Sequence, residues 1–259
     1  MIKRKVASVL ENWLRKSHRK PLVLRGARQV GKSTLVREFA KAAGLELLEV
    51  NLERHAALDS VFRSLDVVRL VREIEGLLGR RVVTENALLF LDEIQATPHA
   101  LAALRYFYEE MPGLPVVAAG SLLEFTLADH EFSMPVGRVE YLHLGPVAFS
   151  EFLAAADSGL VSYLEAAGRF EEIPETAHAR LVERLREFLF IGGMPAAVRE
   201  FLEGGSLVAV REVQRSIVET YQDDFAKYAR REMLARLQSV FQRIPANIGR
   251  KIKYVNLSH

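Results

Sequence analysis

The chain has 259 residues, of which 49% are hydrophobic, with 35 Lys and Arg against 33 Asp and Glu and with no cysteine. This length allows one large domain or a medium domain with an appendage, and the apolar fraction excludes a disordered tail. The lack of cysteine excludes disulfide scaffolds, thiol catalysis and cysteine-ligated metal sites, and it fits the reducing cytoplasm, where we expect the protein to stay.

Strands and helices alternate through the first part of the sequence. Amphipathic spacing predicts helices over residues 4–16, 35–43, 67–78 and 98–111. Short apolar runs predict strands over residues 22–24, 47–52, 87–91, 115–119 and 139–144. This alternation predicts an α/β fold with a mostly parallel sheet sandwiched by helices, which binds ligands at the carboxyl ends of its strands.

After Pro146 the sequence predicts helices alone. They are expected over residues 149–156, 159–167, 178–190, 196–203, 207–228 and 231–243. We therefore predict an α/β domain over residues 1–146, an all-helical lid domain over 147–228, and a basic, incomplete C-terminal segment over 229–259.

A phosphate-binding loop is predicted between the first strand and the helix that follows it. Residues 26–33 read Gly-Ala-Arg-Gln-Val-Gly-Lys-Ser, with two glycines followed by Lys and Ser at the spacing of a P-loop. Glycines let successive backbone N–H groups face phosphate oxygens, Lys32 reaches the β and γ phosphates, and the Ser33 hydroxyl ligates Mg²⁺. The residues expected at the nucleotide are Gly26, Ala27, Arg28, Gln29, Val30, Gly31, Lys32, Ser33 and Thr34. The alternative, a merely tight turn between strand and helix, needs none of this spacing.

Two adjacent acids end the apolar strand over residues 87–91. Side chains of neighbouring residues diverge at a strand end, so Asp92 is assigned to Mg²⁺ and Glu93 to the attacking water, as general base. A solvated strand exit looks the same, and only the upstream P-loop favours the functional interpretation. The second acid favours a hydrolase over a small-molecule kinase, which has less need of Glu93.

Other chemistries lack their patterns in the sequence. No two histidines stand three or four residues apart, and neither a His-Glu-x-x-His nor a Gly-x-Ser-x-Gly motif occurs. Zinc chemistry and acyl transfer are therefore not expected.

The sequence resembles the prokaryotic AAA-domain ATPases, which are P-loop proteins of the additional-strand class akin to STAND ATPases. The resemblance rests on residues 25–34, on Leu-Asp-Glu-Ile-Gln around Asp92 and on Ala-Gly-Ser ending at Ser121, and it covers residues 20–226. It implies ATP with Mg²⁺ as the ligand. In that family the corresponding region leads into a winged-helix-like segment, of which residues 229–259 are a possible start, and many members then carry a C-terminal domain of unknown function. We expect that neither has room in this sequence.

The resemblance implies three further site residues, each with a simpler alternative. Ser121 matches a sensor that meets the γ-phosphate, but it also suits a helix N-cap. Arg138 matches an arginine that approaches the γ-phosphate, but it also suits a surface ion pair. Pro195, in the Gly192-Gly193-Met194-Pro195 turn, matches a lid proline near adenine, whereas Gly and Pro also simply end and begin helices.

The charge of the chain is uneven. Residues 227–259 carry eight Lys and Arg and one acid, while the preceding residues carry 27 Lys and Arg against 32 acids. This basic segment is a candidate surface for a nucleic acid or an acidic protein, or it is an ordinary soluble helix end. No membrane partner is predicted, because the longest stretch without charged residues, 111–123, is shorter than the roughly 18 residues of a spanning helix.

Two functions are consistent with the sequence. The first is Mg²⁺-dependent ATP hydrolysis that drives a conformational switch, with slow turnover. The second is a nucleotide-sensing module that scarcely hydrolyses ATP and acts by binding DNA or a protein. The sequence does not predict the oligomeric state.

Overall fold

The computed structural model describes residues 2–120, 137–167, 172–228 and 231–251. Five strands form one sheet in the order β2-β3-β4-β1-β5, and every pair of neighbours is parallel. The strands are β1 (Leu22–Arg25), β2 (Glu46–Asn51), β3 (Ala87–Asp92), β4 (Val116–Ala119) and β5 (Glu140–His143). The predicted parallel α/β sheet is confirmed.

Strand β4 lies between β1, which leads into the glycine-rich loop, and β3, which ends in the two acids. Its residue Val117 pairs with Leu22 on one side and with Phe90 on the other. This inserted strand is the one that the resemblance to additional-strand ATPases implies. Because all the strands are parallel, the carboxyl ends of β1 and β3 meet at one edge of the sheet.

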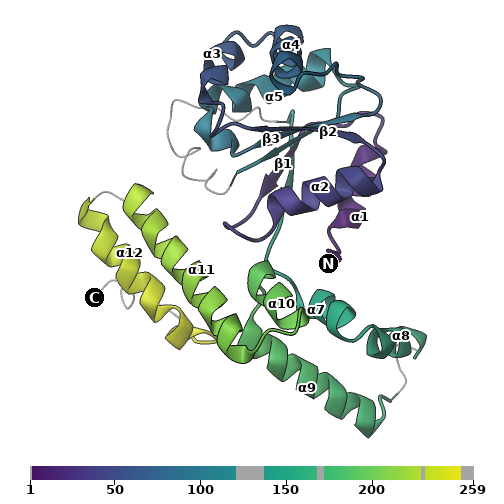
Figure 1. The fold of residues 1–259 in the computed structure, drawn as a ribbon, viewed down its shortest axis with the longest axis vertical. Coiled ribbons are helices and arrows are strands. Elements are labelled where there is room, and N and C mark those ends of the chain that lie inside the picture. The colour runs from purple at the N-terminus through teal and green to yellow at the C-terminus, as the bar shows by residue number, and fades with distance from the viewer. Residues whose placement is uncertain (1, 121–136, 168–171, 229–230, 252–259) are drawn as a thin grey trace. The chain divides into compact units, whose positions relative to one another are not determined.

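Helices cover both faces of the sheet (Figure 1). One face carries α1 (Ala7–Leu14) and α2 (Lys32–Ala42), and the other carries α3 (Asp59–Phe62), α4 (Val67–Leu78) and α5 (Pro98–Glu110). Successive side chains of a strand point to opposite faces, so in β3 Leu88 and Phe90 join one core while Leu89 and Leu91 join the other. All six residues of β3 are buried, which explains its unbroken apolar sequence.

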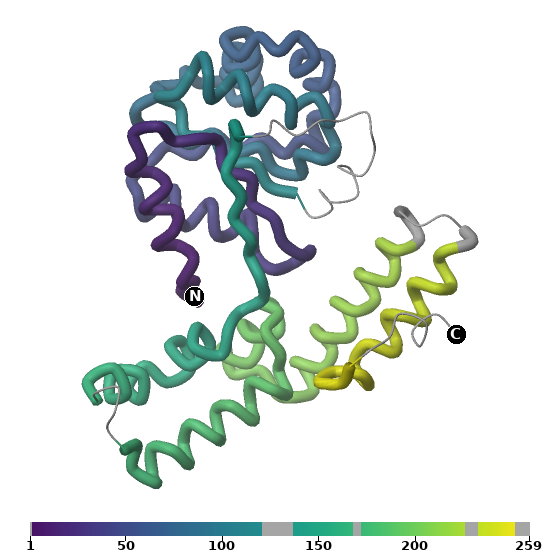
Figure 2. Tube along the Cα trace, turned by 180° about the vertical axis from the view of Figure 1, so that it is seen from behind, coloured from purple at the N-terminus to yellow at the C-terminus, as the bar shows by residue number. Residues whose placement is uncertain are grey.

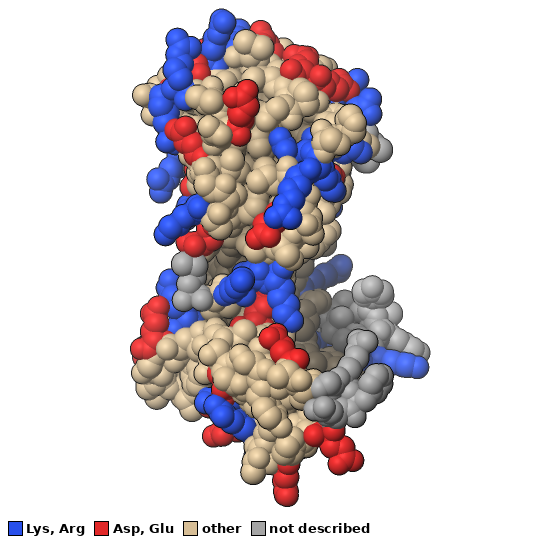
Figure 3. All heavy atoms as spheres, turned by 90° about the vertical axis from the view of Figure 1, so that its right-hand side faces the viewer, with Lys and Arg blue, Asp and Glu red and all other residues tan. Residues whose placement is uncertain are grey.

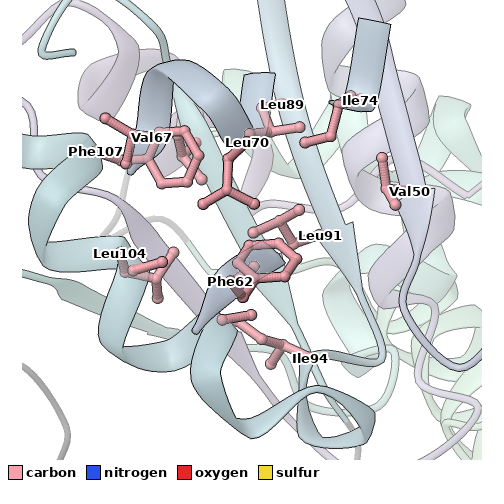
Figure 4. Packing of buried hydrophobic residues seen from close by; sticks show 14 of the residues in the cluster. Val50, Phe62, Val67, Leu70, Ile74, Leu89, Leu91, Ile94, Leu104 and Phe107 are labelled. Carbon is pink, nitrogen blue, oxygen red and sulfur yellow. The ribbon is translucent and has the colours of Figure 1, made fainter. Parts of the chain in front are cut away.

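The core under α3, α4 and α5 is the larger of the two. Figure 4 shows Phe62, Leu70 and Phe107 packed over Leu89 and Leu91 of β3. Burying a side chain of this size contributes about 1.5–3 kcal/mol to folding. This face therefore anchors β3, and with it the two acids at its end.

Helices make up the chain after β5, as predicted. They are α7 (Phe149–Ala156), α8 (Ser158–Ala166), α9 (Glu175–Ile191), α10 (Pro195–Leu202), α11 (Leu207–Tyr228) and α12 (Arg231–Arg243). Short 3₁₀ helices occupy η1 (Ala56–Leu58), η2 (Ile94–Ala96) and η3 (Pro245–Asn247). The sequence had not predicted η1 or the four-residue α3.

The chain divides into two compact units, Met1–Val198 and Arg199–His259. The first unit holds the sheet together with α7, α8 and α9, so the predicted domain limits at 146 and 228 stay predictions. Within this unit the chain leaves the sheet at the end of β5 and runs through residues 144–148 into α7 (Figure 2).

Candidate nucleotide site

The glycine-rich loop joins β1 to α2 at the carboxyl edge of the sheet. Gly26, Gln29 and Gly31 have φ angles of 150°, 65° and 92°, which side-chain-bearing residues rarely adopt. A Cβ at Gly26 would also lie 2.2 Å from the main-chain oxygen of Leu144, so this position needs glycine for space as well. The loop thus contains three residues with positive φ, and turns of this kind form the backbone concavities in which proteins bind phosphate.

Lys32 is folded over this loop. Its Nζ donates hydrogen bonds of 2.9 Å to the main-chain oxygens of Gly26 and Ala27, and the residue is only 8% exposed. Burial lowers the pKa of the Lys32 ammonium, while the negative charges of Glu93 and Asp92 oppose this change. The predicted phosphate-binding lysine therefore lies over the loop, within electrostatic reach of both predicted acids.

Ser33 and Asp92 meet across the edge of the sheet. The Ser33 hydroxyl donates a 2.8 Å hydrogen bond to Oδ2 of Asp92, although 59 residues separate them. Burial raises the pKa of the Asp92 carboxyl, and the hydrogen bond from Ser33 opposes the rise.

This pair of oxygens fits Mg²⁺. Hydroxyl and carboxylate oxygens are the hard ligands that Mg²⁺ prefers, and adjacent ligands of an octahedral ion at about 2.05 Å lie roughly 2.9 Å apart. The observed separation of 2.8 Å is close to this spacing, so Ser33 and Asp92 are the residues that would hold the ion. Across the described ranges no group of three or more His, Asp or Glu residues could hold a metal.

Glu93 occupies a strained turn directly after β3. Its φ of 52° lies in the left-handed region, and its N–H donates to Oδ1 of Asp92 at 3.1 Å. Its carboxylate accepts a short hydrogen bond from Nε2 of Gln95. Backbone strain of this kind costs about 1–3 kcal/mol and is found mostly at functional sites. Gln95 is the last residue of the Leu-Asp-Glu-Ile-Gln stretch on which the resemblance rests, but the sequence analysis assigned it no role, because an amide two residues after an acid does not by itself indicate a contact with that acid.

The other predicted site residues differ in their burial and in their distance from the loop. Val30 is buried behind the loop, whereas Thr34 is exposed on the first turn of α2. Pro195 lies beside the loop, its Cγ 3.8 Å from where a Cβ of Gly31 would stand. Ser121 lies outside the described residues. Of the remaining loop residues, Ala27 and Gln29 are exposed and Arg28 is partly buried.

Arg138 is not brought to the loop. It precedes β5 and so lies at the amino edge of the sheet, whereas the loop follows the opposite end of β1. There its Nε donates to Glu109 at 2.8 Å, in an exposed ion pair near the end of α5. This is the surface pair that the sequence left open as the alternative, and a role at the γ-phosphate stays a prediction.

The turn before α10 packs against the chain that leaves β5. The N–H of Val147 donates to the main-chain oxygen of Gly193 at 2.7 Å. A Cβ at Gly193 would lie only 2.5 Å from the main-chain oxygen of Val147, so the two segments touch through backbone. This contact holds the turn that contains Pro195 beside the loop.

Comparison with known families identifies the fold. Residues 18–153, just over half of the chain, match the family model of an AAA domain. The chain belongs to this AAA-domain family. Residues 182–259 match a domain of unknown function, which overlaps the helices that the sequence assigned to the lid and the basic segment. Membership of the AAA-domain family, which the resemblance implies, is confirmed. A C-terminal domain of unknown function is matched as well, from residue 182 onward, so the expectation that this chain leaves no room for one is wrong.

One solved structure similar to this AAA-domain protein is the Walker-type ATPase PABY2304 of Pyrococcus abyssi. The two are 18% identical, with a TM-score of 0.56, over 99% of this chain and 87% of that chain. At this identity the likeness supports the fold alone. No curated protein matches the chain, and none of the described helices is long and apolar enough to cross a membrane.

Proposed function

We propose that this AAA-domain protein binds ATP together with Mg²⁺ and hydrolyses it slowly. The observation that carries the proposal is the 2.8 Å contact between Ser33 and Asp92, at the end of a loop over which Lys32 is folded. Three residues from two elements thereby supply a cation for phosphate and two oxygens for a metal ion. A tight turn without a function requires none of these contacts.

Each residue has a distinct task in the proposed reaction. The loop N–H groups and Lys32 hold the phosphates, and a bound Mg²⁺ would neutralise charge on the phosphate oxygens. Glu93 takes a proton from the water that attacks the γ-phosphorus, as the bond to the β–γ bridging oxygen breaks and ADP leaves. Gln95 holds the Glu93 carboxylate through its Nε2 and so limits the directions in which that carboxylate points.

The first test separates nucleotide binding from turnover. Lys32→Ala should abolish binding of ATP, and Lys41→Ala, an exposed lysine at the other end of α2, is its control. Glu93→Gln should still bind ATP but lose phosphate release, and Glu85→Gln, exposed just before the opposite end of β3, is its control. Undiminished phosphate release by Glu93→Gln would remove Glu93 from the mechanism.

We also propose that the nucleotide acts as a switch for the segments beside the loop. The position of Pro195 next to Gly31 supports this, since a nucleotide at the loop would meet the turn that leads into α10. The experiment is limited proteolysis with ATP and with ADP, and identical cleavage patterns would count against a switch. That this protein is akin to the STAND ATPases, as the sequence resemblance implies, is likewise a proposal.

A second candidate function is a nucleotide sensor with little turnover. The observation that favours it is the distance of Arg138 from the loop, because an arginine at the γ-phosphate is a major source of rate in such enzymes. Nucleotide that copurifies with the protein, with turnover no faster than spontaneous hydrolysis, would support the sensor. ATP consumption that begins only when an acceptor is added would instead indicate a kinase.

A sensor needs a partner, and we propose that the basic C-terminal segment contacts an acidic one. From residue 233 to 251 the sequence has no Asp or Glu, and Arg236, Arg250 and Lys251 are exposed. On the face drawn in Figure 3, by contrast, basic side chains are interspersed with acidic ones. Titration with random-sequence duplex DNA at several salt concentrations tests this, since phosphate contacts give an affinity that falls steeply with salt.

A further inference from the structure

Arg4, in the segment before α1, contacts the back of the phosphate-binding loop. Its Nη1 donates to the main-chain oxygen of Val30 at 3.1 Å, and its Nη2 donates to the main-chain oxygens of Gly145 and Pro146 at 2.7 and 3.1 Å. Its Nε donates to Oε2 of Glu151 on α7 at 3.1 Å. One guanidinium therefore joins the loop, the chain leaving β5 and the first helix after the sheet.

The contact with Val30 determines the direction of one loop N–H. In a trans peptide the C=O and the N–H point in opposite directions, and the structure contains no cis peptide bonds among the residues it describes. While the Val30 oxygen faces Arg4, the N–H of Gly31 in the same peptide must point away from Arg4. In a P-loop this is an N–H that faces the phosphates.

Glu151 holds Arg4 in place. The Glu151 side chain is 6% exposed and accepts hydrogen bonds from the N–H groups of Lys5 and Ala148, at 2.7 and 2.9 Å, besides the one from Arg4. The three hydrogen bonds occupy both carboxylate oxygens of Glu151 and so hold the Arg4 guanidinium in one orientation. The Arg4 side chain is itself only 12% exposed.

We propose that Arg4 is a positioning residue of the nucleotide site, which orients the Gly31 N–H through Val30 and is itself held by Glu151. This inference rests on the proposed nucleotide binding and deepens it. It makes affinity for the triphosphate depend on the N-terminal segment and on α7, neither of which needs to touch the nucleotide.

The choice of arginine is part of the inference. A planar guanidinium reaches four oxygens in different directions, whereas a lysine ammonium carries the same charge but cannot reproduce this fork. Arg4→Lys should therefore weaken binding despite keeping the charge. Lys16→Gln is the matched control, because Lys16, two residues after α1, also forms an ion pair with β5, through Glu140, but at the amino edge of the sheet.

The experiment is a fluorescence titration with methylanthraniloyl-labelled ATP and Mg²⁺, with melting temperature measured on the same samples. We expect at least about tenfold weaker binding for Arg4→Lys and Arg4→Gln, a smaller loss for Glu151→Gln, and wild-type affinity for Lys16→Gln. The double variant Arg4→Gln with Glu151→Gln should bind no more weakly than Arg4→Gln alone, because the second residue acts through the first.

Separate outcomes decide the inference and the proposed function. A folded Arg4→Lys protein with wild-type affinity, or a lower melting temperature with unchanged affinity, would make Arg4 merely structural. If Arg4→Gln does not fold, the lysine variant alone decides between these roles, and emission of the single tryptophan, Trp13, reports folding. A wild-type chain that binds no better than Lys32→Ala would instead overturn the proposed function, and this inference with it.

Discussion

Gly193→Ala should destabilise the first unit strongly, for steric reasons alone. The φ of Gly193 lies outside the left-handed region, but a Cβ there would lie 2.5 Å from the Val147 oxygen and 2.9 Å from Cβ of Pro146. Real Cβ atoms essentially never come closer than 3.0 Å, so the two backbones must separate by about 0.5 Å. That movement stretches the 2.7 Å hydrogen bond from Val147 to Gly193.

The expected loss follows from these two effects. Overpacking of this kind costs about 1–3 kcal/mol, and weakening the hydrogen bond adds about 1 kcal/mol. The sum of about 2–4 kcal/mol corresponds to a fall in melting temperature of roughly 5–15 °C for a unit of this size. Differential scanning calorimetry measures it directly.

Gly145→Ala is the control for this substitution. Gly145 lies in the same linking segment, has no left-handed φ, and offers open space within 4 Å of a new Cβ. Its replacement should leave the free energy of unfolding unchanged or raise it by up to about 1 kcal/mol, because alanine lowers the conformational entropy of the unfolded chain. Equal melting temperatures for the two variants would refute the argument that backbone contact holds the turn before α10.

Three further results are expected. Ser33→Ala should raise the Mg²⁺ concentration needed for tight ATP binding, measured by titration with the metal, and an unchanged requirement would remove this hydroxyl from the metal shell. Trp13→Phe loses the 2.8 Å hydrogen bond from Nε1 to the Lys20 oxygen and should cost about 1–3 kcal/mol, measured by urea unfolding. Burial would raise the pKa of the Glu151 carboxyl, but hydrogen bonds from Ala148 and Lys5 and the charge of Arg4 hold it below the ordinary value of a glutamate. Its ionised form therefore stabilises the fold above the pKa of the unfolded chain, and the stabilisation is lost as pH falls through the lower folded pKa. Melting temperatures from about pH 6 to 3 should fall less steeply for Glu151→Gln than for the wild type, and parallel curves would contradict this.

Local pattern was enough to pick out the residues at the centre of the candidate site, which the structure brings together. The loop glycines and Lys32 stand within eight residues, and Asp92 ends an apolar run that β3 buries on both sides. Each of these motifs consists of residues that are close together in the sequence, so it can be recognised without knowledge of the fold. Their meeting at Ser33 then follows from the parallel arrangement of the strands.

Long-range contacts account for what the sequence did not predict. Arg4 lies 26 residues from Val30 and 147 from Glu151, and nothing in the local spacing marks it. The position of Arg138, however, was open to deduction: it precedes a strand, and in a parallel sheet the strand starts lie at the edge away from the loop.

The strand order also has a consequence for how the chain acquires its fold during synthesis. Residues Leu22 to Leu24 of β1 pair on one side with residues of β4 that are 95 positions later, and on the other side with the still later β5. At about 5–20 residues per second, a ribosome needs roughly 5–20 s to make that interval. Throughout this interval the apolar strand β1, which has a neighbour on each side in the finished sheet, has neither of them. The nascent chain must therefore keep β1 from pairing with other strands until β4 emerges, and chaperone binding to β1 would be greatest during this interval.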